Sequence, residues 1–121
     1  MDNINKIYYE GFEGEPEIRF ICNKGSDKDI IIIWEGYFDQ IMTLIQPEAN
    51  GWTGLAYYYN MYLGWYEEDS WEMDNIDIAI NQFETIDCDM LGNETSKVLK
   101  IVINMLEYAV DNNYEVFIER D

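Results

Sequence analysis

The chain of 121 residues contains no histidine. Histidine is the commonest general base and the commonest transition-metal ligand in proteins, so its absence argues against zinc sites and against Ser-His or Cys-His nucleophiles. Gly-rich phosphate loops are missing as well, because GFEGEP (11–16) matches neither the Walker nor the dinucleotide pattern and carries carboxylates that repel phosphate. We therefore expect no nucleotide chemistry, no metal and no cofactor.

Basic residues are scarce: seven Lys and Arg stand against 25 Asp and Glu, which gives a formal net charge of −18. The 68 positions between Lys28 and Lys97 hold 14 carboxylates and no basic residue. Such a segment repels nucleic acid, which is bound through Lys and Arg, and it repels anionic membrane surfaces. We expect neither as a partner. The negative field attracts cations, which include a metal, a basic ligand or a basic protein whose approach it accelerates.

Cysteine is scarce too, and Cys22 and Cys88 form no CxxC or Cys/His motif. The first 16 residues lack the apolar core and positive start of a signal peptide, and no apolar run reaches transmembrane length. We therefore expect a cytoplasmic protein with two reduced, core-type thiols, a disulfide between them being the alternative.

Apolar residues, in contrast, are abundant, and their 48 % share is too high for a disordered acidic chain. The length fits one domain, residues 1–121. Strands are predicted at 17–22 and 30–34, joined as a hairpin whose second strand is covered on both faces, at 114–120, and at 6–10. Helices are predicted at 38–45, stopped by Pro47, and at 76–83 and 95–112, while residues 53–63 fit a helix slightly better than a strand. The predicted fold class is α+β: a small, mostly antiparallel sheet packed with three or four helices.

Two of the predicted helices carry polar residues at regular spacing. Asp77, Asn81 and Glu84 fall on the outer face of helix 76–83, and either Asp74 or Asn75 can cap its start. Helix 95–112 is apolar except for one narrow polar stripe, so we expect it to be mostly buried. The basic residues of this stripe come early and the acidic ones late, opposite to what the helix dipole favours. Asn112 and Asn113 offer a left-handed stop.

Residues 51–74, GWTGLAYYYNMYLGWYEEDSWEMD, combine five tyrosines and three tryptophans with five carboxylates. In one interpretation the rings pack in the core and the acids solvate a loop. In the other, some rings lie exposed beside the acids as an interface, because Tyr and Trp anchors bind at small entropic cost and carboxylates pair with Lys and Arg of a partner. The two interpretations can share the segment.

Carboxylates alone can build a glycosidase or a magnesium enzyme, but among 25 of them pairs arise by chance. A calcium loop beginning at Asp87 fails, because Leu91 and Val98 stand where the fifth and twelfth ligands belong. We therefore expect a binding protein and not an enzyme.

In general character the chain resembles the small, acidic bacterial immunity proteins that neutralise nuclease toxins of contact-dependent inhibition, polymorphic-toxin and colicin systems. The features that carry the resemblance are GWYEEDSWEMD (64–74), the span 29–96 with acidic charges alone, and the ending EYAVDNNYEVFIERD (107–121). The resemblance implies a basic cognate toxin domain, a nuclease, whose phosphate sites the inhibitor's carboxylates would occupy. The expected charged contacts are Glu67, Glu68, Asp69, Glu72, Asp74 and Asp77, and the expected aromatic anchors are Tyr66 and Trp71.

Three other functions stay open. A nucleic-acid mimic that blocks a DNA- or RNA-binding protein would need acids spaced like phosphates over a long, rigid surface. A carboxylate-based hydrolase would need convergent acids in a concave pocket. An adaptor or structural domain would need neither. The sequence gives no prediction of the oligomeric state.

Overall fold

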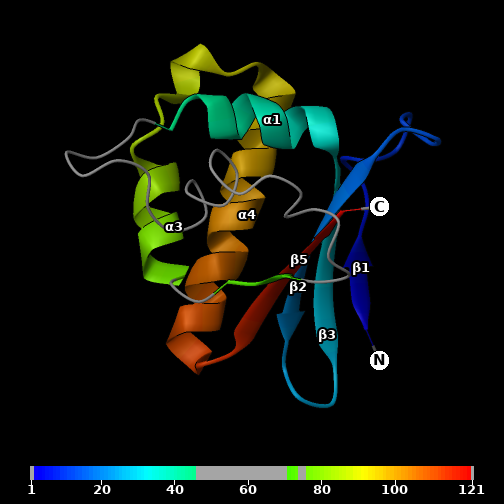
Figure 1. Ribbon diagram of the computed structural model, residues 1–121, viewed down its shortest axis with the longest axis vertical. Coiled ribbons are helices and arrows are strands. Elements are labelled where there is room, and N and C mark those ends of the chain that lie inside the picture. Colours follow the sequence, from blue (N-terminus) through cyan, green and yellow to red (C-terminus); the bar gives the residue numbers. More distant parts are fainter. Residues whose placement is uncertain (1, 46–70, 74–75, 121) are drawn as a thin grey trace.

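The computed structural model describes residues 2–45, 71–73 and 76–120. They form an α+β fold in which a five-stranded, mostly antiparallel sheet packs against three α-helices (Figure 1), as the sequence predicts. The strands are β1 (Asn3–Asn5), β2 (Glu17–Asn23), β3 (Lys28–Trp34), β4 (Trp71–Glu72) and β5 (Glu115–Arg120). The helices are α1 (Glu35–Thr43), α3 (Ile76–Glu84) and α4 (Asn93–Asn112), with a short 3₁₀ turn, η2 (Cys88–Met90), before α4.

The strand order is β1-β3-β2-β5-β4. β2 and β3 form the predicted hairpin, paired from Glu17↔Trp34 to Asn23↔Lys28. β5 lies between β2 and β4 and is antiparallel to both, whereas β1 runs parallel to β3. The sheet is therefore mixed, with a single parallel pair among the described strands.

The strand predicted at residues 6–10 is wrong. The backbone N–H groups of Tyr9 and Glu10 both donate to the Lys6 carbonyl, so the chain turns there instead of extending. The N-terminal edge strand is the shorter Asn3–Asn5, whose three residues are too few to show an alternating pattern.

The sheet has one face covered by helices and one outer face. Alternation along the strands directs every second side chain to the helices, as predicted for β2. These helix-facing, buried side chains are Ile18, Phe20, Cys22, Ile31, Ile33, Val116 and Ile118. The prediction that β3 is covered on both faces holds only in part, because Ile30, Ile32 and Trp34 on its outer face are half-buried and Phe12 covers Trp34. A β-branched run thus marked a central strand, but its outer face has no helix over it among the described residues.

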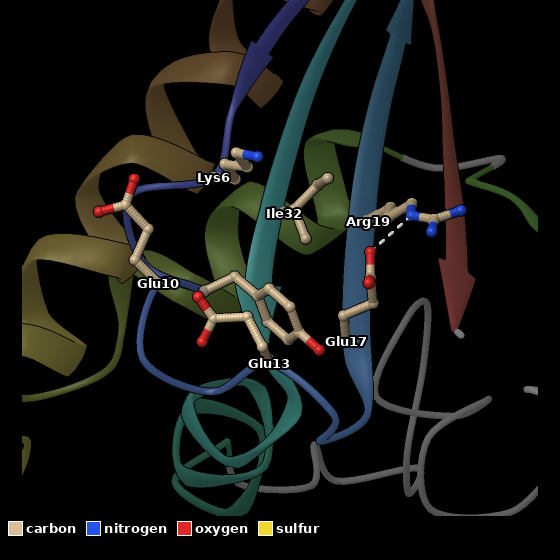
Figure 2. Close-up of a pocket in the computed structure, with 7 residues that line it drawn as sticks. Lys6, Glu10, Glu13, Glu17, Arg19 and Ile32 are labelled. Carbon is tan, nitrogen blue, oxygen red and sulfur yellow. Dashed lines mark hydrogen bonds and ion pairs between the residues drawn. The ribbon is translucent and has the colours of Figure 1, made fainter.

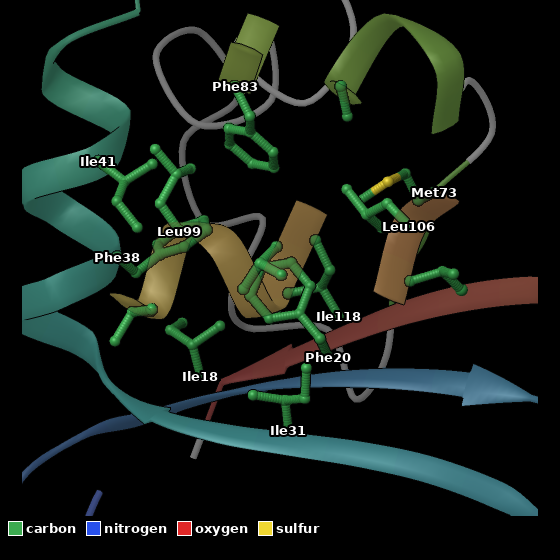
Figure 3. Close-up of a cluster of buried hydrophobic side chains, with 14 of the residues drawn as sticks. Ile18, Phe20, Ile31, Phe38, Ile41, Met73, Phe83, Leu99, Leu106 and Ile118 are labelled. Atoms are coloured by element: carbon green, nitrogen blue, oxygen red, sulfur yellow. The ribbon is translucent and has the colours of Figure 1, made fainter. Parts of the chain in front are cut away.

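The helices cover the inner face through apolar residues at helical spacing. Figure 3 shows Ile18, Phe20 and Ile31 of the sheet directed toward the helices, where Phe38 and Leu99 meet them. The buried helical side chains include Phe38, Ile41 and Met42 of α1, Ala79, Ile80 and Phe83 of α3, and Val98, Leu99, Val102, Leu106 and Ala109 of α4. None of the described helices is long and apolar enough to span a membrane.

Helix α4 ends as predicted, at Asn113, which adopts the left-handed conformation with φ of 58°. The N–H of Tyr114 then donates to the Ala109 carbonyl over 2.8 Å, which satisfies one of the last helical acceptors. The predicted polar stripe is exposed along its whole length: Lys97, Lys100, Asn104, Glu107 and Asp111. At the other end, the buried Thr95 hydroxyl donates to Gln40 Oε1 over 2.6 Å and joins α4 to α1.

The two cysteines differ in environment. Both are free thiols, and Cys22 is buried among the core residues of β2 as expected. Cys88 is exposed in η2, so the prediction of a core position for it is wrong. The short, polar turn Asp87–Met90 has no apolar spacing that would place Cys88 inside.

Candidate protein-binding surfaces

The residues predicted to contact a partner lie only partly in the described chain. Tyr66, Glu67, Glu68, Asp69 and Asp74 lie outside the described residues, as do Asn75, Pro47 and the ambiguous segment 53–63. Trp71 and Glu72 form the edge strand β4, in which Glu72 pairs with Phe117 of β5 and is exposed. Asp77 is exposed in the first turn of α3, where the helix dipole stabilises a carboxylate. The structure thus places Glu72 and Asp77 at the surface, on two separate elements.

The outer face of α3 is acidic, as predicted. Asp77, Asn81 and Glu84 are all exposed, whereas the opposite face is buried. The acidity continues beyond the helix in η2 and at the start of α4, where the exposed acids are Asp87, Asp89 and Glu94. The Asp87 carboxylate accepts a hydrogen bond from the Asp89 N–H over 3.0 Å, which fixes this turn. Carboxylates therefore follow the helical side of the molecule along three consecutive elements.

Sequence reasoning missed two exposed apolar side chains, one beside these acids and one near the other end of α4. Met90 is 69 % exposed between Asp89 and Leu91, and Tyr108 on α4 is 39 % exposed, with its ring 5.7 Å from that of Tyr114. Large side chains that stay exposed next to charges are typical of the centres of protein interfaces. Met90 had a sequence signal, because it follows two aspartates in a segment without helical or strand period.

Asp77 also lines a hollow of about 350 Å³ between α3 and the end of α4. Its walls are Ile76, Asp77, Ile78, Ala109, Val110, Asn113 and Tyr114. The last turn of α4 has no basic residue to complement its negative dipole end. A carboxylate on one wall and a helix C-terminus on the other make this hollow favourable for a cationic side chain.

A second hollow, of about 530 Å³, lies on the outer face of the sheet beneath the turn at residues 6–13 (Figure 2). Ile32 of β3 and Arg19 of β2 form part of its floor, and Lys6, Glu10 and Glu13 surround it from the turn. The turn is held against the sheet by Phe12, whose ring stacks on Trp34 at a centroid distance of 4.3 Å.

The acidic side chains in this second hollow are either exposed or paired with a basic residue. A carboxylate-based hydrolase needs one acid kept protonated by apolar surroundings beside an ionised one. Glu10 and Glu13 are exposed, and Glu17 accepts a hydrogen bond from Arg19 Nε over 2.6 Å. Among the described residues, no group of three or more His, Cys, Asp or Glu side chains is placed to hold a metal ion.

The few basic side chains are largely neutralised within the protein. Arg19 contacts Glu119 at 3.6 Å as well as Glu17, and Arg120 Nε lies 2.6 Å from Glu35 Oε2. Lys24 Nζ lies 3.2 Å from Asp29, and the hydrogen bond between them raises the pKa of Lys24. A further ion pair joins Lys97 to Glu94 over 3.5 Å. At least four of the seven basic residues therefore have acidic partners in the chain itself.

Comparison of the chain with protein-family models, with curated proteins and with solved structures finds no match.

Proposed function

We propose that the protein is an immunity-type inhibitor that binds a basic toxin domain, a nuclease, and blocks it. The observation that carries this proposal is the distribution of charge. At least four basic side chains are paired internally, whereas exposed carboxylates continue from α3 through η2 to α4. A protein with this surface attracts a basic partner over long distances and discriminates against acidic ones.

The inhibitory mechanism follows from what a nuclease must bind. Its substrate groove is lined with Lys and Arg that contact phosphates, and carboxylates of the inhibitor would pair with the same side chains. The opposite charges of the two proteins raise the association rate. Slow dissociation, in contrast, requires desolvated contacts near the centre of the interface. Met90 and the predicted anchors Tyr66 and Trp71 are the candidates for these contacts.

The experiment that tests this proposal is affinity capture of the tagged protein from lysate of its own host, at low and at moderate salt. We expect one basic, nuclease-like domain that stays bound at moderate salt, because a desolvated interface is screened less than exposed charges are. The captured domain, expressed alone, should arrest growth, and co-expression of this protein should restore it. Recovery of assorted basic proteins that all wash off as salt rises would contradict the proposal.

A further inference from the structure

The outer face of the sheet carries an apolar row that crosses four strands. The register aligns Ile4 with Ile30, Ile30 with Ile21, and Ile21 with Phe117. Ile4 is 59 % exposed, and both Ile30 and Phe117 are only half-buried. Apolar side chains aligned across a sheet are usually packed against a second layer, and the described helices all lie on the other face.

Part of this row is open to solvent. A hollow of about 210 Å³ lies over Ile21 and Phe117, and its rim is formed by Asn23, Lys28 and Glu119. The turn that carries Phe12 covers only the far end of the face, at Trp34. Among the described residues, this region thus has an apolar centre, in which Ile21 is 9 % exposed and Phe117 half-buried, and a polar rim, which is the usual anatomy of a protein interface.

The charge of this face differs from that of the rest of the molecule. The two hollows on it are lined by four acidic residues, Glu10, Glu13, Glu17 and Glu119, and by three basic ones, Lys6, Arg19 and Lys28. The whole chain, in contrast, has 25 acidic and seven basic residues. A nearly balanced surface is one on which two copies of so acidic a protein can meet with little local repulsion.

We propose that two copies of the chain pair through this outer face. In a two-fold dimer the same patch meets itself, so the patch must be complementary to itself. We place the two-fold axis between the two outer faces, over β2 and parallel to it. This axis puts β3 of each copy opposite β5 of the other copy. Because Lys28 and Glu115 flank Asn23 on either side, Lys28 of each copy then faces Glu115 of the second copy. In the same arrangement Ile30 faces Phe117, and Ile21 faces its own equivalent. Arg19 also faces its own equivalent, and its charge is offset within each copy by Glu17 and Glu119.

The test is sedimentation equilibrium of the full chain over protein concentrations from about 1 μM to about 1 mM, the range in which modest affinities are resolved. We expect the dimer to tighten as salt rises from about 0.05 M to about 0.5 M, because the net repulsion between two acidic copies is screened. A complex with a basic partner should weaken over the same range. The two associations can therefore be distinguished, because rising salt increases the affinity of one and decreases that of the other. A chain that stays monomeric throughout would overturn the proposal.

Charge exchange tests the geometry. Lys28→Glu and Glu115→Lys alone should each weaken the dimer about tenfold, because each puts like charges opposite one another. The double variant Lys28→Glu/Glu115→Lys restores the opposite charges and should return to within about threefold of the original affinity. Glu84→Lys on the outer face of α3 is the control for net charge, and this variant should not weaken the dimer. Circular dichroism verifies the fold of each variant. A dimer that tolerates both single changes would use another face, and the proposal would fail.

Discussion

Gly36 lies beneath the Trp34 indole, and a methyl group at position 36 would overlap that ring. The ring cannot move freely, because it stacks on Phe12 and meets Tyr37 edge-on at 5.3 Å. We expect Gly36→Ala to lower the free energy of unfolding by about 1–3 kcal/mol, as overpacking does elsewhere. Urea denaturation measures the change.

The same change made in a Trp34→Ala variant separates the overlap with the Trp34 ring from other effects of the alanine. With Trp34→Ala in place the clash disappears, and Gly36→Ala should then be neutral or stabilise the helix by up to about 1 kcal/mol. An equal loss of stability in both backgrounds would show that the Trp34 ring is not the cause.

The two thiols should differ in reactivity. Burial, and then the charge of Asp29, raises the pKa of Cys22 above its ordinary value of 9.0, whereas Cys88 is exposed. We expect a thiol reagent to label Cys88 rapidly in the native protein and Cys22 only as the protein unfolds. In the Cys88→Ser variant the rapid phase should vanish; a rapid phase that persists would mean that Cys22 is accessible.

The same pKa shift predicts how stability depends on pH. The folded protein holds the Cys22 proton more tightly than the unfolded chain, so the contribution of this group is fully present below the unfolded pKa and is lost as pH rises through the folded one. Above about pH 9, stability should therefore fall more steeply in the original protein than in Cys22→Ala. Urea denaturation at several pH values measures the two slopes, and equal slopes would contradict this assignment.

Among the elements, α4 is stabilised by tertiary packing, which outweighs an unfavourable arrangement of charges along the helix. Its last turns carry Glu107 and Asp111 and no basic residue, although the helix dipole favours cations there. Asp111→Lys should therefore raise the free energy of unfolding by about 0.3–1 kcal/mol, with Asp111→Asn giving a smaller gain. Thermal denaturation at low salt measures both, and a destabilised Asp111→Lys variant would contradict this account of the charges.

The elements that could be predicted from the sequence are those with a long, regular period. The alternation in β2 and the helical spacing in α3 and α4 indicated both the type of element and its buried face. β1 has three residues, too few for a pattern, and its parallel pairing with β3 depends on the path of the chain around the sheet. The hollows could not be predicted either, because each joins residues that are distant in sequence. Asp77, for example, shares its hollow with Tyr114.

At the scale of the whole molecule, net charge is a sum over residues and could be obtained without a structure. Which carboxylates are exposed depends on the fold, and the structure places Asp87 and Asp89 at the surface in the turn that follows α3. Of the predicted contacts, Glu72 and Asp77 proved exposed, and all eight stay predictions as contacts with a partner.

Charge reversal at the centre of the predicted surface tests those contacts. The triple variant Glu67→Lys, Glu68→Lys, Asp69→Lys should slow association with the toxin domain about tenfold and leave the fold intact, because steering depends on the local field. The control is the triple variant Glu10→Lys, Glu13→Lys, Glu15→Lys, which changes net charge equally at three exposed positions of the N-terminal turn. Surface plasmon resonance measures both rates. Unchanged binding of the first variant would exclude this segment as the interface.

The place of β5 within the sheet has a consequence for how the protein folds. β5 follows every other described element in sequence, yet it lies between β2 and β4 and pairs with both. Pairing β5 with β2 requires contacts between residues about a hundred positions apart, which is slow compared with forming a local hairpin. During synthesis the β5 side of β2 therefore stays an open edge until β5 arrives, and an open edge of this kind invites pairing with other chains. The acidic surface is then useful before any partner is bound, because like charges keep nascent copies apart while that edge is exposed.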